Sequence, residues 1–238
     1  MNSGTYFIKD GYQSALPEST WNSEGAAFLT DERIRMSEVY QYHVYKLAAH
    51  LSRQMNVESV VDIGCGTAYK LMNLVFPICQ NVTGIDSQPA AELCKTRYSA
   101  GAFYTEDLEA PTLKLKGGYD MVICSDVIEH LIDPNVLVDY IKALCHENTL
   151  IVISTPERDY LRGPNCMACR KPGHIREWNE EELTRYLQSR GLKIIKSILY
   201  PPMRFNWSKE YFSFLKRVIR AEHAFNTCQT LVTKTSGN

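Results

Sequence analysis

The chain has 238 residues, enough for one large domain or two small ones that bury a core without disulfides. Hydrophobic residues make up 45% of it and charged residues 22%, which excludes a disordered, collagenous or coiled-coil protein. With 26 Lys and Arg against 27 Asp and Glu, the net charge of -1 disfavours a dedicated nucleic-acid-binding protein.

The distribution of apolar residues along the chain bears on the cellular location of the protein. Residues 1–10 are polar and lack the hydrophobic region of a signal peptide, and no run of about 18 apolar residues could span a membrane. The eight cysteines are then expected to be reduced thiols, several of them small core residues. These features predict a cytoplasmic protein.

Strands and helices are expected to alternate along most of the chain. Residues 1–30 are rich in Ser, Gly, Thr and Tyr and predict an irregular arm, whereas apolar residues recurring every four positions predict one helix over 31–55. Strands are expected at 59–64, 82–86, 102–105, 119–125, 149–155, 192–200 and 227–234. Further helices are expected at 69–78, 89–98, 134–145 and 179–190, the last with Asn179 as N-cap and Gly191 as its stop. This alternation predicts a largely parallel sheet whose ligands bind at the carboxyl ends of the strands.

A glycine loop follows the first predicted strand, in the segment Asp62-Ile-Gly-Cys-Gly-Thr-Ala-Tyr69. Gly64 and Gly66 would let the backbone turn tightly and approach a ligand closely. A dinucleotide site would have a third glycine at position 69, where Tyr69 stands. Asp62 is a poor neighbour for a pyrophosphate and a good one for a cation, so an NAD-dependent oxidoreductase is disfavoured.

Two further acidic positions follow the next two strands. Asp86 ends the second strand and could accept both hydroxyls of a ribose. Asp107 and Leu108 follow the third strand, where a carboxylate and an aliphatic side chain suit an adenine. The pocket is therefore expected to take a ribose and a base with some positive charge and no phosphate, as in S-adenosyl-L-methionine (SAM).

These motifs resemble those of the class I SAM-dependent methyltransferases over roughly residues 35–234. The segment from Asp62 to Ala68 looks like their motif I, although many members have a third glycine in place of Ala68. The resemblance implies one α/β domain over residues 31–238, with a Rossmann-like, seven-stranded, mostly parallel sheet, helices on both faces and an antiparallel last strand. It also implies SAM contacts from Asp62, Gly64, Cys65, Gly66, Asp86, Ser87, Asp107, Leu108 and Ser125.

Asp126, Glu129 and His130 directly follow the fourth predicted strand, and their spacing would place them on one face of a helix. Such a group could hold Mg²⁺ or Mn²⁺. The spacing resembles a Glu-x-x-Glu-His motif of small-RNA 2′-O-methyltransferases and of some ubiquinone-pathway O-methyltransferases. In the RNA enzymes a histidine after the fifth strand completes the metal site, a place that His174 would take here. The alternative is that the Glu-His pair only braces the loop.

Residues 156–178 form a long insertion without periodicity, which is typical of a functional lid. His174 is its candidate general base, with a structural hydrogen bond as the alternative, and Asp126 is the second predicted catalytic residue. Arg158, Arg162 and Arg176 are expected to bind hydroxyls or an acidic group of the acceptor.

The segments Ser-Thr-Pro-Glu-Arg-Asp (154–159) and His-Ile-Arg-Glu-Trp (174–178) also resemble those of bacterial methyltransferases of glycan and natural-product pathways. This resemblance implies O-methylation of a small polyhydroxylated acceptor. The alternatives are an RNA end, a quinone precursor or a non-catalytic SAM-binding subunit. A second insertion is expected at 201–226, where the basic, aromatic stretch 207–225 could touch a membrane surface but is better explained as packing on the domain.

Overall fold

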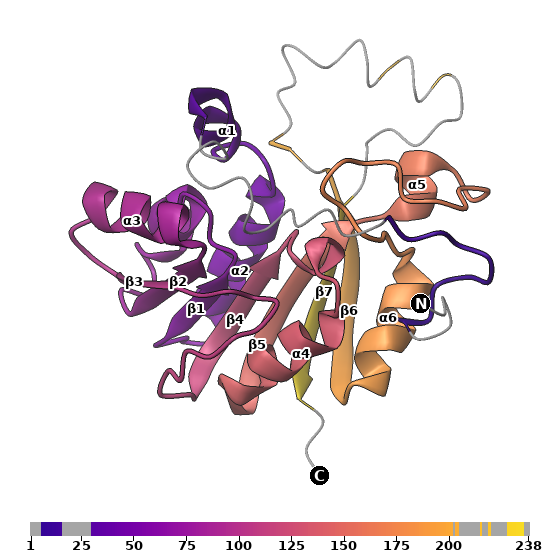
Figure 1. Ribbon diagram of the computed structural model, residues 1–238. Helices are drawn as coiled ribbons and strands as arrows, with labels where there is room; N and C mark the ends of the chain where they lie inside the picture. Colours follow the sequence, from indigo (N-terminus) through magenta and orange to yellow (C-terminus); the bar gives the residue numbers. More distant parts are fainter. Residues whose placement is uncertain are drawn as a thin grey trace.

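The computed structural model describes residues 6–15, 30–201, 203–204 and 228–235, together with the single positions 215 and 219. Its centre is a seven-stranded sheet in the order β3-β2-β1-β4-β5-β7-β6 (Figure 1). The strands are β1 (Val60–Ile63), β2 (Val82–Asp86), β3 (Ala102–Thr105), β4 (Tyr119–Ser125), β5 (Cys145–Pro156), β6 (Leu192–Tyr200) and β7 (Cys228–Thr235). β7 runs antiparallel to β5 and β6, and the other neighbouring strands are parallel. The fold inferred from the resemblance is confirmed.

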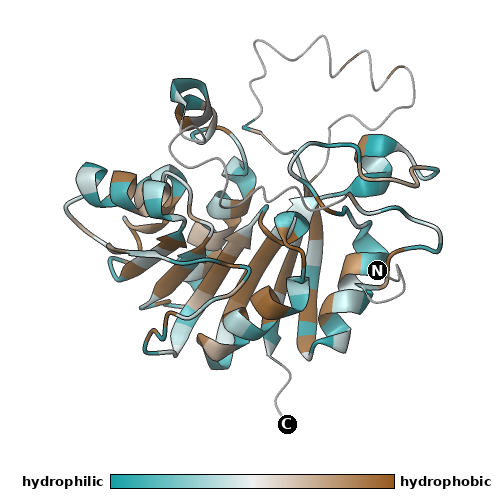
Figure 2. Ribbon diagram, in the orientation of Figure 1, coloured by the Kyte–Doolittle hydropathy of each residue, from teal (hydrophilic) through white to brown (hydrophobic). Residues whose placement is uncertain are grey.

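Helices cover both faces of this sheet and divide the core in two. They are α1 (Asp31–Met36), α2 (Tyr42–Gln54), the π-helical η3 (Leu71–Val75), α3 (Gln88–Arg97), the short 3-10 helix η4 (Ile128–His130), α4 (Pro134–Ala143), α5 (Arg158–Arg162) and α6 (Glu180–Ser189). One core layer holds apolar residues of α4 and α6, and the other holds those of α2 and η3. Side chains of β4 alternate between them, because Val122 and Cys124 belong to the first layer and Met121 and Ile123 to the second. Figure 2 shows the strands as the hydrophobic centre of the molecule.

The single helix expected over 31–55 is interrupted between α1 and α2, where Gln41 has a left-handed φ of 50°. The interruption follows from contacts with the glycine loop. Lys70 Nζ donates to the carbonyl of Ser37 at 2.7 Å, and the hydroxyls of Ser37 and Thr67 lie 2.7 Å apart. An α-helix would need the Ser37 carbonyl as the acceptor for residue 41. A tertiary contact therefore takes the place of a helical hydrogen bond.

The insertion at 156–178 is packed into the domain through the N-terminal residues 6–15. Gln13 forms a β-bridge with Ala168, and the Trp178 indole donates to the carbonyl of Tyr6 at 3.0 Å. Several residues of the insertion are buried, namely Glu157, Arg158, His174, Ile175, Arg176, Glu177 and Trp178. The described part of the predicted irregular arm thus holds the insertion in place beside the carboxyl ends of β4 and β5 (Figure 1).

The N-terminus of α6 carries the cap that the sequence predicts. The Asn179 side chain accepts from the backbone N–H of Glu182 at 2.9 Å, and the Glu182 carboxylate accepts from the N–H of Asn179 at 3.1 Å. We expect Asn179→Ala to lower the free energy of unfolding by about 1 kcal/mol, measured by urea denaturation. Gln188→Ala, on the exposed side of the same helix, is the control. Equal free energies for the two variants would show that the cap contributes nothing.

Among the residues that the structure describes, no helix is both long and apolar enough to cross a membrane. The basic, aromatic stretch 207–225 lies outside the described residues, apart from positions 215 and 219.

Candidate active site

The glycine loop lies between the carboxyl ends of β1 and β2. Gly64 has a φ of 75°, and a Cβ there would lie 2.3 Å from a methyl group of Val127, so only glycine fits. Gly66 has a φ of 56° with open space beside it, and its N–H donates to Asp86 Oδ2 at 2.7 Å. Ala68, at φ 51°, occupies the left-handed conformation that a third glycine would adopt more easily. The backbone of Gly66 is thus left open next to the carboxylate of Asp86.

The Asp86 carboxylate is buried and oriented by neighbouring donors. Its Oδ1 accepts from the N–H of Ser87 at 2.7 Å and from the Ser87 hydroxyl at 3.1 Å, while Oδ2 accepts from Gly66. Burial raises the pKa of Asp86, and these three donors oppose that rise. A carboxylate offers about four acceptor positions, so one remains for a ligand.

Asp62 lies deeper, fully buried at the end of β1. Both of its oxygens accept from the Tyr45 hydroxyl, at 3.1 and 2.9 Å. Burial raises the pKa of Asp62 to about 7 and lowers that of nearby Lys70 to about 8. Tyr45 and Lys70 were not predicted from the sequence. The one sequence feature that could have indicated them is that each is a polar residue on an otherwise apolar helical face, and such a face is expected to pack against the loop.

The remaining predicted cofactor contacts lie in this loop, after β3 or at the end of β4. Leu108 is fully buried and Cys65 is 6% exposed, while Asp107 is half-buried and accepts from the N–H of Glu109 at 3.0 Å. The hydroxyl of Ser125 lies 2.7 Å from that of Ser154. Glu106 was not predicted from the sequence. Its buried carboxylate accepts hydrogen bonds from the N–H groups of Asp107, Thr112 and Leu113 and so shapes the turn after β3.

Asp126 joins several parts of the site. It directly follows β4 with a left-handed φ of 54°. Its Oδ2 accepts from the Gln41 amide at 2.9 Å, and its Oδ1 accepts from the Ser154 hydroxyl at 2.9 Å and from the Cys228 thiol at 3.4 Å. The side chain therefore connects the α1–α2 linker to β4, β5 and β7.

The structure brings three of the four predicted metal ligands together. Glu129, His130 and His174 each offer a ligand atom within 4.8 Å of the others. Asp126 is outside this group, because its left-handed backbone directs the carboxylate to Gln41 and Ser154. The expected common helical face is not formed, since the segment makes only the short helix η4.

Glu129 is the most unusual member of this group, which we call the Glu129 cluster (Glu129, His130 and His174). It is fully buried; its Oε2 accepts from the Thr155 hydroxyl at 2.8 Å, and its Oε1 has no hydrogen-bond partner among the described residues. Burial raises the pKa of Glu129 well above its usual value. A buried, unpartnered carboxylate oxygen is costly, so the site favours a proton or a cation beside it.

Two imidazoles lie beside that oxygen. His130 Nε2 is 4.0 Å from Glu129 Oε1, and the centroids of the His130 and His174 rings are 4.7 Å apart. Burial lowers the pKa of His130 to about 4 and also lowers that of His174. Both rings are therefore neutral at pH 7, which is the form that binds metals.

The structure corrects the expected role of the arginines in the insertion. Arg158 is fully buried and donates to both carboxylate oxygens of Glu182, at 2.6 and 2.9 Å. Arg176 is 2% exposed and donates to the carbonyls of residues 131 and 132 at 2.8 Å each. Arg162 pairs with Glu177. These guanidinium groups hold the insertion together, so the proposed acceptor contacts of Arg158 and Arg176 were wrong.

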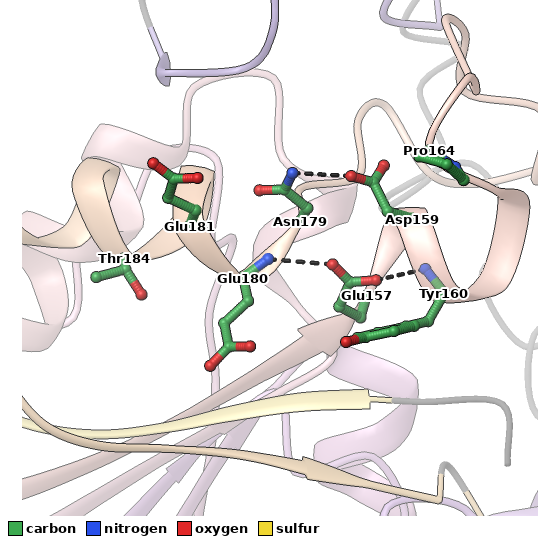
Figure 3. Close-up of a pocket in the computed structure, with 8 residues that line it drawn as sticks. All are labelled: Glu157, Asp159, Tyr160, Pro164, Asn179, Glu180, Glu181 and Thr184. Carbon is green, nitrogen blue, oxygen red and sulfur yellow. Dashed lines mark hydrogen bonds between the residues drawn. The ribbon is translucent and has the colours of Figure 1, made fainter. Parts of the chain in front are cut away.

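An open depression of about 630 Å³ lies beside α5 and α6 (Figure 3). Its lining contains none of the predicted site residues and consists of Glu157, Asp159, Tyr160, Pro164, Asn179, Glu180, Glu181 and Thr184. The Glu157 carboxylate accepts from the N–H groups of Tyr160 and Glu180, and Asp159 accepts from the Asn179 amide. These side chains connect α5 to α6, and we assign them no chemistry.

Comparison with known proteins gives both a family and a fold. The family model described as "Methyltransferase domain" matches residues 33–197. A ubiquinone biosynthesis O-methyltransferase from Rickettsia akari is 25% identical over 209 residues, which cover 81% of each chain. The protein of the same name from Bradyrhizobium diazoefficiens is 25% identical over 164 residues; the match covers 63% of this chain and 64% of the relative, less than two thirds of its length.

Solved structures resemble the whole domain. The N-methyltransferase NodS from Bradyrhizobium japonicum, in complex with S-adenosyl-L-homocysteine, superposes with a TM-score of 0.63 at 14% identity and covers 92% of this chain and 100% of its own. The plantazolicin methyltransferase BamL gives a TM-score of 0.62 at 19% identity, with coverage of 92% and 94%. At these identities the likeness concerns the fold.

Proposed function

Since the chain belongs to the methyltransferase domain family and is a SAM-dependent enzyme, we propose that it methylates a hydroxyl group of a small polyhydroxylated acceptor. We further propose that a divalent cation, Mg²⁺ or Mn²⁺, binds at the Glu129 cluster. The observation that carries the proposal is the buried Glu129 Oε1, which has no partner among the described residues and lies beside two imidazoles.

The glycine loop and the acids around it suit SAM. Gly66 leaves open space where a side chain would stand, so a ligand can lie against its backbone. Asp86 has an acceptor position left for a ribose, and Leu108 and Asp107 flank the base in the proposed arrangement. SAM supplies an electrophilic methyl group on a positively charged sulfur. A buried carboxyl group such as Asp62, whose pKa is raised, would gain from a cationic ligand nearby.

The chain's own residues define how an acceptor hydroxyl could be activated. A cation bound by Glu129, His130 and His174 would lower the pKa of that hydroxyl. Without a cation, a neutral His174 can accept the hydroxyl proton itself, as a general base does. Asp126, the second proposed catalytic residue, lies outside the cluster, and its carboxylate is oriented by Gln41 and Ser154. The insertion would cover the acceptor and exclude water.

A quinone precursor is a second candidate acceptor. The relatives from Rickettsia akari and Bradyrhizobium diazoefficiens bear the name ubiquinone biosynthesis O-methyltransferase, which favours a phenolic hydroxyl. Support for a sugar is weaker than expected from the sequence, because Arg158 and Arg176 are occupied within the protein. The net charge of -1 weighs against an RNA end.

Methyl transfer from SAM to a panel of catechols and polyols is expected to stop in excess EDTA and to return on addition of Mg²⁺ or Mn²⁺. Glu129→Gln should show the same loss, because the cation loses its only carboxylate in the cluster. Glu157→Gln, which changes another buried carboxylate, should keep its metal response.

Full activity in excess EDTA would contradict the proposed cation site, and His174 would then be a general base or a structural residue. SAM binding with no transfer to any hydroxylated acceptor would favour the non-catalytic subunit.

A further inference from the structure

We propose that Glu177 is a positioning residue that holds the His174 ring in the tautomer with its proton on Nδ1, so that the unprotonated Nε2 serves the Glu129 cluster. The role of Nε2 in binding a cation or a proton at the cluster rests on the proposed function. The tautomer itself depends only on the contacts of Glu177 and can be tested separately.

The contact between the two side chains is buried and direct. His174 is 2% exposed and Glu177 is fully buried, and His174 Nδ1 lies 3.0 Å from Glu177 Oε1. Arg162 donates to both oxygens of the same carboxylate, from its terminal nitrogen to Oε1 at 3.0 Å and from Nε to Oε2 at 3.1 Å. A guanidinium group has only donors, so both oxygens of Glu177 act as acceptors. His174 Nδ1 must therefore be the donor.

The backbone of Glu177 is held as firmly as its side chain. Its N–H donates to the Tyr12 hydroxyl at 3.2 Å, and its carbonyl accepts from an Arg158 nitrogen at 3.3 Å. Every polar group of Glu177 thus has a partner, and Tyr12 comes from the N-terminal residues 6–15. These contacts orient the carboxylate toward His174.

His130 has the same arrangement through a different acceptor. Its Nδ1 lies 2.6 Å from the carbonyl oxygen of Gly173, which can only accept, so this nitrogen also carries the proton. Each ring therefore has its unprotonated nitrogen at Nε2. Metal-binding histidines almost always donate their second N–H to a carboxylate or a backbone carbonyl. Glu177 and Gly173 supply these two acceptors, and Glu129 Oε1 supplies the buried anionic ligand.

Nitrogen NMR of the metal-free protein, labelled with ¹⁵N at histidine, tests the tautomer directly. We expect wild-type His174 to show a protonated Nδ1 and an unprotonated Nε2. In Glu177→Gln, the amide can donate as well as accept, so a second population with the proton on Nε2 should appear. The His130 signals should not change. Affinity for Mn²⁺ alone, followed by the electron paramagnetic resonance of the unbound ion, should fall about 10- to 100-fold.

Glu182→Gln is the matched control. It removes a buried carboxylate that pairs with Arg158 in the same region but touches neither histidine. It should lower stability and leave the His174 tautomer and Mn²⁺ affinity unchanged.

A wild-type His174 protonated on Nε2 would overturn the inference even if Glu177→Gln does not fold, and so would an unaltered tautomer in Glu177→Gln. The expected tautomers together with no Mn²⁺ binding to the wild type would support the role of Glu177 and contradict only the metal part of the proposed function.

Discussion

Asp86→Ala is expected to weaken SAM binding by about 10²-fold or more, measured by calorimetry. A ribose hydroxyl would lose its charged acceptor, and such a hydrogen bond contributes about 1.5 to 3 kcal/mol. The substitution also leaves the Gly66 N–H without its acceptor, so the glycine loop loses an anchor. Asp86→Asn, which can still accept from Gly66, should bind SAM with an intermediate affinity.

Asp120→Ala is the matched control for this experiment. Asp120 also accepts three hydrogen bonds, from the backbone N–H groups of Glu58 and Ser59 and from the Ser59 hydroxyl. It lies near the start of β4, at the opposite end of the sheet from Asp86. SAM affinity should be unchanged in this variant. An Asp86→Ala protein that binds SAM as tightly as the wild type would exclude Asp86 from the cofactor site.

His174→Ala is expected to lower turnover by about 10²-fold or more while leaving SAM affinity nearly unchanged. The reason is that His174 belongs to the Glu129 cluster after β4 and β5, whereas the proposed cofactor contacts follow β1, β2 and β3 for the most part. The measurement is steady-state kinetics with the acceptor found in the panel, together with SAM calorimetry.

His146→Ala controls for the loss of an imidazole that pairs with a carboxylate, because His146 Nε2 lies 3.1 Å from Asp120 Oδ1 away from the cluster. Partial rescue of His174→Ala by excess Mn²⁺ would identify His174 as a metal ligand, and a low activity that Mn²⁺ does not restore would identify it as a base. Near-wild-type turnover would show that the histidine is structural.

Local patterns account for the parts of the fold that the sequence predicts well. The strands at 82–86, 102–105 and 119–125 were predicted at their observed bounds, because short β-branched or aromatic runs there end at turn residues. Asn179 and Gly191 delimit α6 because capping depends on residues within one turn of the helix end. The antiparallel seventh strand followed only from the family resemblance, since nothing local distinguishes its direction.

Only part of the candidate site could be predicted from the sequence. Its residue types and the strand ends that carry them could be read from the sequence, and the structure places Gly66 and Asp86 in contact. The break between α1 and α2, the direction of Asp126 and the pairing of the insertion's arginines could not. Each depends on a partner distant in the chain: Lys70 for Ser37, Gln41 for Asp126, and Glu182 for Arg158.

By itself, then, the sequence of this protein determined the order of strands and helices, the glycine loop and the set of acids and histidines available for chemistry. Only the tertiary structure decided which of these side chains are paired within the protein and which keep a polar atom without a partner among the described residues. The physical reason is that secondary structure follows from contacts within a few residues, whereas a buried polar group must find its partner wherever the fold brings one. For Glu177 that partner is His174 on one side and Arg162 on the other, and for Glu129 Oε1 there is none among the described residues.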